Sequence, residues 1–195
     1  MNESVEKLRQ LVSASEYIAF FGGAGVSTES GIPDYRSDDG LYNQKYSYPP
    51  EVMLSHSFFM KKPEQFFAFY RDKMVYTGAQ PNAAHHALAR LEQQGKLRAV
   101  ITQNIDGLHQ RAGSKRVLPF HGDYETAHCR ACRHECDGAA LRAQLEIEHI
   151  PSCPRCGGVM KPDVVFFGEN VLHLDHADRA ISESDLLLVL GSSLP

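Results

Sequence analysis

Three short apolar runs constrain the fold of this chain most strongly. They are residues 17–21 (YIAFF), 97–102 (LRAVIT) and 185–191 (DLLLVLG). Continuous apolar stretches of this length are typical of parallel strands that are covered on both faces by helices. Residues 81–94 begin with proline and end just before Gly95, which predicts a helix between the first two strands. The order of strand, helix and strand predicts a right-handed parallel α/β sheet.

Four of the five cysteines form two closely spaced pairs. Cys129 and Cys132 make the first C-x-x-C pair, and Cys153 and Cys156 make the second after twenty intervening residues. Two such pairs supply the four thiolates of a tetrahedral Zn²⁺ site, which leaves no open position for catalysis. We therefore predict one structural zinc ion, with Cys136 left over as an ordinary small residue.

Two stretches interrupt the alternation of predicted strands and helices. Residues 37–79 are rich in aromatic side chains and include a predicted helix from 63 to about 76, and residues 124–160 contain the cysteine pairs. We predict that these inserts, one helical and one a zinc ribbon, form a small domain. The main domain is then a Rossmann-like, doubly wound parallel sheet made of residues 1–36, 80–123 and 161–195. Ligands of such folds bind outside the C-terminal ends of the strands.

The composition is that of an ordinary folded chain. Of 195 residues, 43% are hydrophobic and 23% are charged, and the formal net charge is −4. This charge argues weakly against nucleic-acid binding, which needs a basic excess. No apolar run reaches the roughly 18 residues of a membrane span, and the N-terminus lacks the apolar core of a secretory signal. We expect a soluble, cytoplasmic protein without membrane contact, whose N-terminal helix packs through Val5, Leu8, Leu11 and Val12.

A glycine-rich turn, residues 23–28 (GAGVST), follows the first predicted strand and precedes a predicted helix. Glycines in this position let backbone N–H groups approach a pyrophosphate, and a helix N-terminus adds favourable partial charge. The turn departs from the dehydrogenase fingerprint, because Thr28 replaces its third glycine and no acidic residue follows at the expected distance. A hydride-transferring dehydrogenase therefore fits poorly, while another mode of dinucleotide binding stays open. A nucleic-acid-binding ribbon is a further alternative.

Longer motifs give the chain a specific resemblance. Residues 23–36 read GAGVSTESGIPDYR, residues 102–109 read TQNIDGLH, and His121-Gly122 follows a short apolar segment. The cysteine pairs come next, and then residues 164–169 (VVFFGE) and 191–194 (GSSL). These six motifs, in this order over residues 17–194, closely resemble those of sirtuins of the bacterial type, which are NAD-dependent protein lysine deacylases. The resemblance implies NAD as co-substrate, one structural zinc ion and acetylated lysines of proteins or peptides as substrates, with no need for nucleic acid.

In sirtuins the acyl oxygen of the modified lysine attacks C1′ of the nicotinamide ribose, and the products are nicotinamide and O-acyl-ADP-ribose. The resemblance makes His121 the base that deprotonates the ribose, and the ordinary pKa of histidine, about 6.5, suits that task. Asp106 and the backbone of Ile105 resemble the pair that grips the nicotinamide carboxamide. Asn104 and Gln103 match residues that hold ribose hydroxyls and a bound water. We expect His121, Asn104 and Asp106 to form the catalytic set.

The other implied NAD contacts lie in two of the motifs, residues 23–36 and 191–194, and are Ala24, Thr28, Tyr35, Arg36, Ser192 and Ser193. Ala24 and Thr28 would line the pyrophosphate, and the two serines would meet the adenosine. Arg36 would face phosphate and Tyr35 would shield the cationic ribose centre from water. The peptide substrate would contact Val165 and Phe167. Four histidines, namely His85, His86, His109 and His128, are interpreted as structural.

The chain departs from the family pattern in several places. Tyr35 stands where phenylalanine is common, and Asp123 follows His121-Gly122 where small or amide residues are frequent. The Tyr-x-x-Arg pair of desuccinylating sirtuins is replaced by Tyr70 and Lys73, which favours acetyl or another neutral acyl group.

Sirtuins usually continue for about another strand–helix–strand unit beyond the GSSL motif. That unit contributes to adenosine and peptide binding, so a chain ending at residue 195 is interpreted as a fragment with an exposed apolar edge along residues 186–190. The resemblance implies the family's activity for a chain that includes this unit, and leaves it open for these 195 residues alone.

Overall fold

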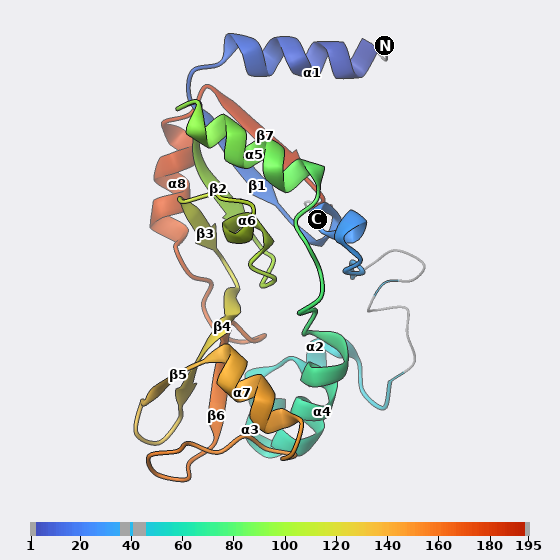
Figure 1. Ribbon diagram of the computed structural model, residues 1–195, viewed down its shortest axis with the longest axis vertical. Helices are drawn as coiled ribbons and strands as arrows, with labels where there is room; N and C mark the ends of the chain where they lie inside the picture. Colours follow the sequence, from blue (N-terminus) through green and yellow to red (C-terminus); the bar gives the residue numbers. More distant parts are fainter. Residues whose placement is uncertain (1–2, 36–39, 41–45, 194–195) are drawn as a thin grey trace.

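A parallel sheet of four strands organises the upper lobe of the computed structural model, which describes residues 3–35, 40 and 46–193 (Figure 1). The strands lie in the order β3-β2-β1-β7 and run parallel throughout. Their bounds are β1 (Ile18–Gly22), β2 (Leu97–Thr102), β3 (Val117–Pro119) and β7 (Leu186–Leu190). The three strands expected from the apolar runs are therefore confirmed, and β3 joins them.

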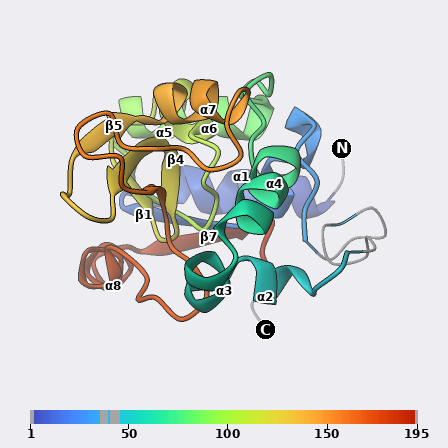
Figure 2. The ribbon, with the colours of Figure 1, turned by 90° about the horizontal axis from the view of Figure 1, so that it is seen from below.

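Helices cover both faces of this sheet, as its apolar strands require. Figure 2 shows α5 (Ala83–Gln93) and α6 (Leu108–Arg111) on one face and α8 (Leu174–Ser182) on the other. Ile18, Phe20 and Val100 of the strands are fully buried and pack with Leu88 of α5. The doubly wound α/β fold is thus confirmed.

The lower lobe in Figure 1 combines an antiparallel sheet with short helices. Its strands have the order β5-β4-β6, with β4 (Gly122–Cys129), β5 (Glu135–Asp137) and β6 (Met160–Val164). The helices are α2 (Pro50–Met53), α3 (His56–Lys61), α4 (Pro63–Lys73) and α7 (Gly138–Leu145). A buried aromatic cluster that includes Phe59, Phe66, Phe67 and Phe166 joins the helices to the strands.

The proposed domain boundaries stay a prediction. Strand β4 crosses the expected boundary at residue 123, and β6 pairs with β4 although it begins at the boundary near residue 160. Within the described residues, no helix has the length and apolar character needed to cross a membrane.

The N-terminal helix α1 (Glu3–Ala14) forms as expected, but its predicted packing face does not. Val5, Leu8 and Leu11 are 54%, 47% and 46% exposed, and only Val12 packs against the core of the upper lobe. Lys96 instead holds the end of the helix, because its Nζ donates to the carbonyls of Val12 and Ser13. The amphipathic pattern predicted the helix correctly and its burial wrongly.

The predicted helix after the glycine turn is also absent from residues 23–31. Two short 3₁₀ turns, η1 (Ala24–Val26) and η2 (Thr28–Ser30), take its place. The expected apolar edge is confirmed, because β7 has no partner on its outer side among the described residues and Leu187 and Leu190 are 41% and 48% exposed.

Candidate active site

A cleft of about 740 Å³ lies where the two lobes meet. The upper lobe contributes the segments that follow β1, β2 and β7, so the cleft opens at the C-terminal ends of parallel strands. The lower lobe contributes residues 164–169 and the end of α4. This is the position at which doubly wound sheets bind ligands.

Two glycines of the turn, Gly23 and Gly25, pack closely against the backbone that follows β7. The N–H of Gly23 donates to the carbonyl of Leu190, and that of Gly25 donates to the carbonyl of Gly191. A Cβ on Gly23 would lie 2.6 Å from the Gly191 oxygen, and one on Gly25 would lie 2.8 Å from the Gly191 Cα. The N–H groups of Gly23 and Gly25 are therefore already hydrogen-bonded within the fold, and binding of a pyrophosphate by the other N–H groups of the turn stays a prediction.

A buried polar network joins the turn to the segment after β2. Ser27, which is fully buried, donates from Oγ to Asp106 Oδ2 at 2.6 Å and accepts from Asn104 Nδ2 at 3.0 Å. The other oxygen of Asp106 accepts from the N–H of Leu108 at 2.9 Å. Asp106 as a residue is 6% exposed, and its carboxylate is oriented through both of its oxygens.

The ring of His121 is fixed by the same segment. Its Nδ1 lies 2.9 Å from the carbonyl oxygen of Gln103. A carbonyl only accepts, so Nδ1 carries the proton and Nε2 keeps its lone pair. Burial lowers the pKa of His121, and the hydrogen bond to Gln103 opposes that shift. Asp123, which follows two residues later, accepts from the N–H of Glu125 at 2.9 Å.

Most of the site residues expected from the sequence line this cleft. They are Ala24, Tyr35, Gln103, Asn104, Ile105, Asp106, His121, Val165, Phe167, Ser192 and Ser193. Thr28 does not: it is exposed, and its Oγ1 donates to the carbonyl of Gly25. Arg36 lies outside the described residues. The sequence reasoning passed over Ser27, although its place in the GAG-x-S motif was a signal that could have singled it out.

The predicted peptide-contacting segment is anchored on both sides of the cleft. The N–H of Val165 donates to the carbonyl of His121, and the N–H of Phe167 donates to that of Leu54. Glu169 receives hydrogen bonds from the N–H of Phe166 at 2.8 Å and from Lys161 Nζ at 3.2 Å. With its backbone held in this way, Phe167 leaves half of its side chain exposed at the cleft.

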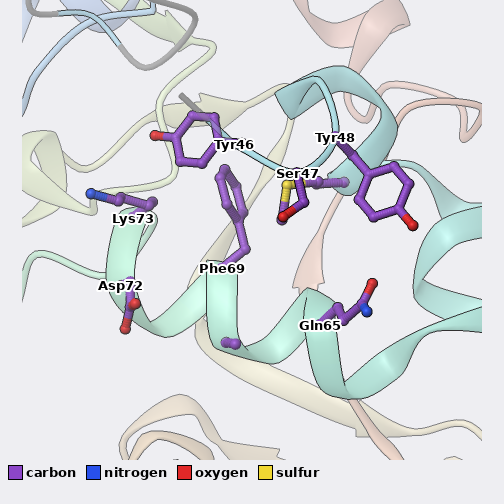
Figure 3. Close-up of a pocket in the computed structure, with 9 residues that line it drawn as sticks. Tyr46, Ser47, Tyr48, Gln65, Phe69, Asp72 and Lys73 are labelled. Atoms are coloured by element: carbon purple, nitrogen blue, oxygen red, sulfur yellow. The ribbon is translucent and has the colours of Figure 1, made fainter. Parts of the chain in front are cut away.

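A second hollow, of about 690 Å³, lies on the helical insert between residues 46–48 and α4 (Figure 3). Tyr46 packs edge-on against Phe69 there, with a ring separation of 5.2 Å. Lys73 lines both this hollow and the cleft, whereas Tyr70 lines neither and is 1% exposed. The two residues that replace the Tyr-x-x-Arg pair are therefore not presented together to the cleft.

The four paired cysteines converge at the far end of the ribbon. Their Sγ atoms all lie within 4.8 Å of one another, with separations of 3.5 Å for Cys129–Cys156, 3.7 Å for Cys132–Cys153 and 3.4 Å for Cys132–Cys156. Tetrahedral zinc–sulfur bonds of about 2.3 Å place sulfurs about 3.8 Å apart, so this donor set fits Zn²⁺.

Backbone geometry completes the two cysteine knuckles. The N–H groups of Ala131 and Cys132 point at Cys129 Sγ, and a Cβ on Gly158 would lie 3.1 Å from the same sulfur. Strand β4 connects this cluster to His121, and its rise of about 3.3 Å per residue allows a separation of up to roughly 26 Å. A zinc ion there would be structural, because four thiolates leave no open position for a substrate and none of the four cysteines lines the cleft.

This protein is a two-lobed α/β protein, with a doubly wound parallel sheet in one lobe and a four-cysteine ribbon in the other. The cleft between the lobes holds an oriented Ser-Asn-Asp network beside a neutral histidine. The family model described as the Sir2 family matches residues 23–195. The chain belongs to the Sir2 family, the sirtuins.

Relatives and solved structures agree with this assignment. The chain is 51% identical to an NAD-dependent protein deacetylase of Clostridium acetobutylicum, over 98% of this chain and 79% of the relative. It is 52% identical to the NAD-dependent protein deacetylase of Clostridium tetani, over 97% and 77%. A solved complex of Sir2, p53 peptide and NAD+ is similar with a TM-score of 0.81 and 38% identity, over 98% of this chain and 76% of that one.

Proposed function

We propose that this protein removes acetyl or other neutral acyl groups from lysine side chains of proteins, using NAD and releasing nicotinamide and O-acyl-ADP-ribose. The observation that carries the proposal is the cleft itself, in which an oriented Asp106 and a neutral His121 lie between the two lobes. Relatives covering nearly the whole chain are named NAD-dependent protein deacetylases, which supports the same reaction.

The residues present fit an NAD molecule. A cavity of about 740 Å³ lies within the usual range for cofactor sites, and it extends from the glycine turn to Ser192 and Ser193 after the last strand. When bound, NAD supplies a ribose whose bond to nicotinamide is broken during acyl transfer. Asp106 would accept from the carboxamide N–H groups, and Ser27 and Leu108 would keep its carboxylate in the required orientation.

His121 would act as the general base. With Nδ1 held as a donor to Gln103, Nε2 is free to accept a proton from a ribose hydroxyl. Burial favours the neutral form of the ring, which is the form that can accept a proton. Val165 and Phe167 would bind the acyl-lysine peptide at the opposite wall of the cleft.

The neutral acyl preference follows from the surroundings of Lys73. It is the residue of the Tyr70 and Lys73 pair that reaches the cleft, and a lone ammonium cannot make the bidentate contact that a succinyl carboxylate takes from arginine. Acetylated peptides are therefore expected to react faster than succinylated ones.

The test is to incubate the purified protein with an acetyl-lysine peptide, with and without NAD, and to separate the products by chromatography. The proposal requires free nicotinamide and deacetylated peptide only when NAD is present. The His121→Ala variant is the matched control and should form no deacetylated peptide, because the base is needed for the steps that follow departure of nicotinamide. Formation of reduced nicotinamide cofactor, seen by its absorbance, would indicate a dehydrogenase instead and would overturn the proposal.

A further inference from the structure

The segment that carries Asp106 is held from outside the cleft by one tyrosine. Tyr124 lies in strand β4 of the lower lobe, is 2% exposed and is not among the residues that line the cleft. Its hydroxyl donates to the main-chain carbonyl of Asp106 at 3.0 Å. Burial raises the pKa of this phenol to about 12, so it remains a donor at neutral pH.

Tyr124 holds the carbonyl of the Asp106–Gly107 peptide bond, which has little restraint from its own residues. Asp106 is followed by Gly107, whose φ of 67° lies in the left-handed region that glycine adopts without strain. A glycine in this position leaves the Asp106–Gly107 peptide with little steric restraint of its own. The hydrogen bond from Tyr124 supplies a restraint on the main chain, in addition to those that Ser27 and Leu108 place on the carboxylate.

Tyr124 is itself held by the ribbon. Arg142 of α7 donates from Nη1 to the carbonyl of Tyr124 at 2.7 Å, and its guanidinium lies 5.3 Å from the centre of the tyrosine ring. Helix α7 lies between the two cysteine pairs in sequence. A chain of direct contacts therefore runs from the ribbon through Arg142 and Tyr124 to the main chain of Asp106.

We propose that Tyr124 is a positioning residue for the nicotinamide end of the NAD site, acting through its hydrogen bond to the Asp106 carbonyl. This inference rests on the proposed function, because it takes Asp106 to be the contact to the carboxamide. The zinc-binding lobe would then contribute to NAD binding through a specific hydrogen bond, in addition to its general support of the fold.

The variant Tyr124→Phe tests the proposal, because it removes the hydroxyl and keeps the ring. Tyr70→Phe is its matched control: Tyr70 belongs to the same buried cluster, and its hydroxyl has no hydrogen-bond partner within the described structure. Steady-state kinetics would give kcat and the KM values for NAD and for acetyl-lysine peptide. The base-exchange reaction would give the KM for nicotinamide.

We expect Tyr124→Phe to raise the KM for NAD and for nicotinamide by about 3- to 10-fold, the effect of one net hydrogen bond. The KM for the peptide and the zinc content should stay within about 2-fold of the parent protein, because neither depends on this bond. Tyr70→Phe should leave all of these values unchanged. Equal KM values for NAD and nicotinamide in the two variants would overturn the proposal.

Two further measurements keep this test separate from the proposed function. If the parent protein does not deacetylate, the proposed function fails, and titration calorimetry with NAD alone still compares the two variants: equal affinities contradict the role of Tyr124. If Tyr124→Phe does not fold, Arg142→Gln removes the contact that holds Tyr124 from the ribbon side. Arg142→Gln should raise the KM for NAD by a smaller factor than Tyr124→Phe. An unchanged KM would contradict the proposed role of the contacts from Arg142 through Tyr124 to Asp106.

Discussion

Ser27 and Asp106 are joined by a buried hydrogen bond of 2.6 Å, although the two residues are 79 positions apart in the chain. This bond links the turn after β1 to the segment after β2. It therefore makes the orientation of the Asp106 carboxylate depend on the glycine turn.

Replacing Ser27 with alanine should impair NAD binding and stability together. The change leaves one oxygen of a buried carboxylate without its donor, which costs about 1–3 kcal/mol. We expect the KM for NAD to rise about 10-fold and the urea midpoint to fall. Ser30→Ala, in the same turn, is the control, since its hydroxyl contacts Asn82 rather than Asp106. Equal KM values for the two variants would contradict this account of Ser27.

The pH dependence of the reaction should report the environment of His121. Burial lowers the pKa of this ring below its usual value of about 6.5, so the neutral base persists on the acid side of that value. We expect the acid limb of kcat/KM, which reports the free enzyme, to have its midpoint below pH 6.5. A midpoint above pH 7 would show that His121 does not control this limb.

Two other histidines should make the fold sensitive to acid. Burial lowers the pKa of His109 to about 3 and lowers that of His85 as well, and the two rings lie 4.6 Å apart. The unfolded chain therefore binds more protons than the folded one below pH 6.5, and stability decreases as the pH falls from there towards 3.

Urea unfolding at pH 7 and pH 5 would measure this effect for His109. Replacing His109 with glutamine should reduce the loss of stability between the two pH values by up to about 1.4 kcal/mol per pH unit. The cysteine ligands also take up protons in acid, but they do so in both proteins and cancel in the comparison. An identical pH dependence in the two proteins would show that the pKa of His109 is the same in the folded and the unfolded chain, which contradicts this account.

Removal of zinc should unfold the ribbon. Structural zinc sites contribute apparent binding free energies of about 10–16 kcal/mol, more than a small lobe can replace by packing. Cys153→Ala should lose the metal by elemental analysis and lower the melting temperature. Cys136→Ala is the matched control, because Cys136 lies outside the four-cysteine cluster. This variant should keep about one zinc ion per chain. Full zinc content in Cys153→Ala would contradict the assignment.

Local patterns predicted the fold well wherever burial and local sequence agreed. The apolar runs located β1, β2 and β7, and the spacing of the cysteines predicted the cluster that the fold assembles. The N-terminal helix shows the limit of this reasoning: its amphipathic pattern is real, yet burial of that face depends on what the fold places beside it.

The candidate site was predicted from motifs, and its internal contacts were not. Gly23 and Gly25 are needed for packing against Gly191, a residue more than 160 positions away, so their role could not be inferred from the turn alone. The same holds for the contacts of Asp106 with Ser27 and Tyr124, which depend on how the lobes are assembled. Thr28 is the converse case: its motif position predicts a pyrophosphate contact, but it is not among the residues that line the cleft, so this contact stays a prediction.

The most direct test of the proposed function is to follow where the acyl group goes. Mass spectrometry of a reaction with NAD and a peptide labelled with ¹³C in its acetyl group should show the label on ADP-ribose. Deacetylated peptide, nicotinamide and O-acetyl-ADP-ribose should then form in equal amounts, and Asp106→Asn should suppress all three together. Labelled free acetate as the initial product, or deacetylation that continues without NAD, would contradict the account.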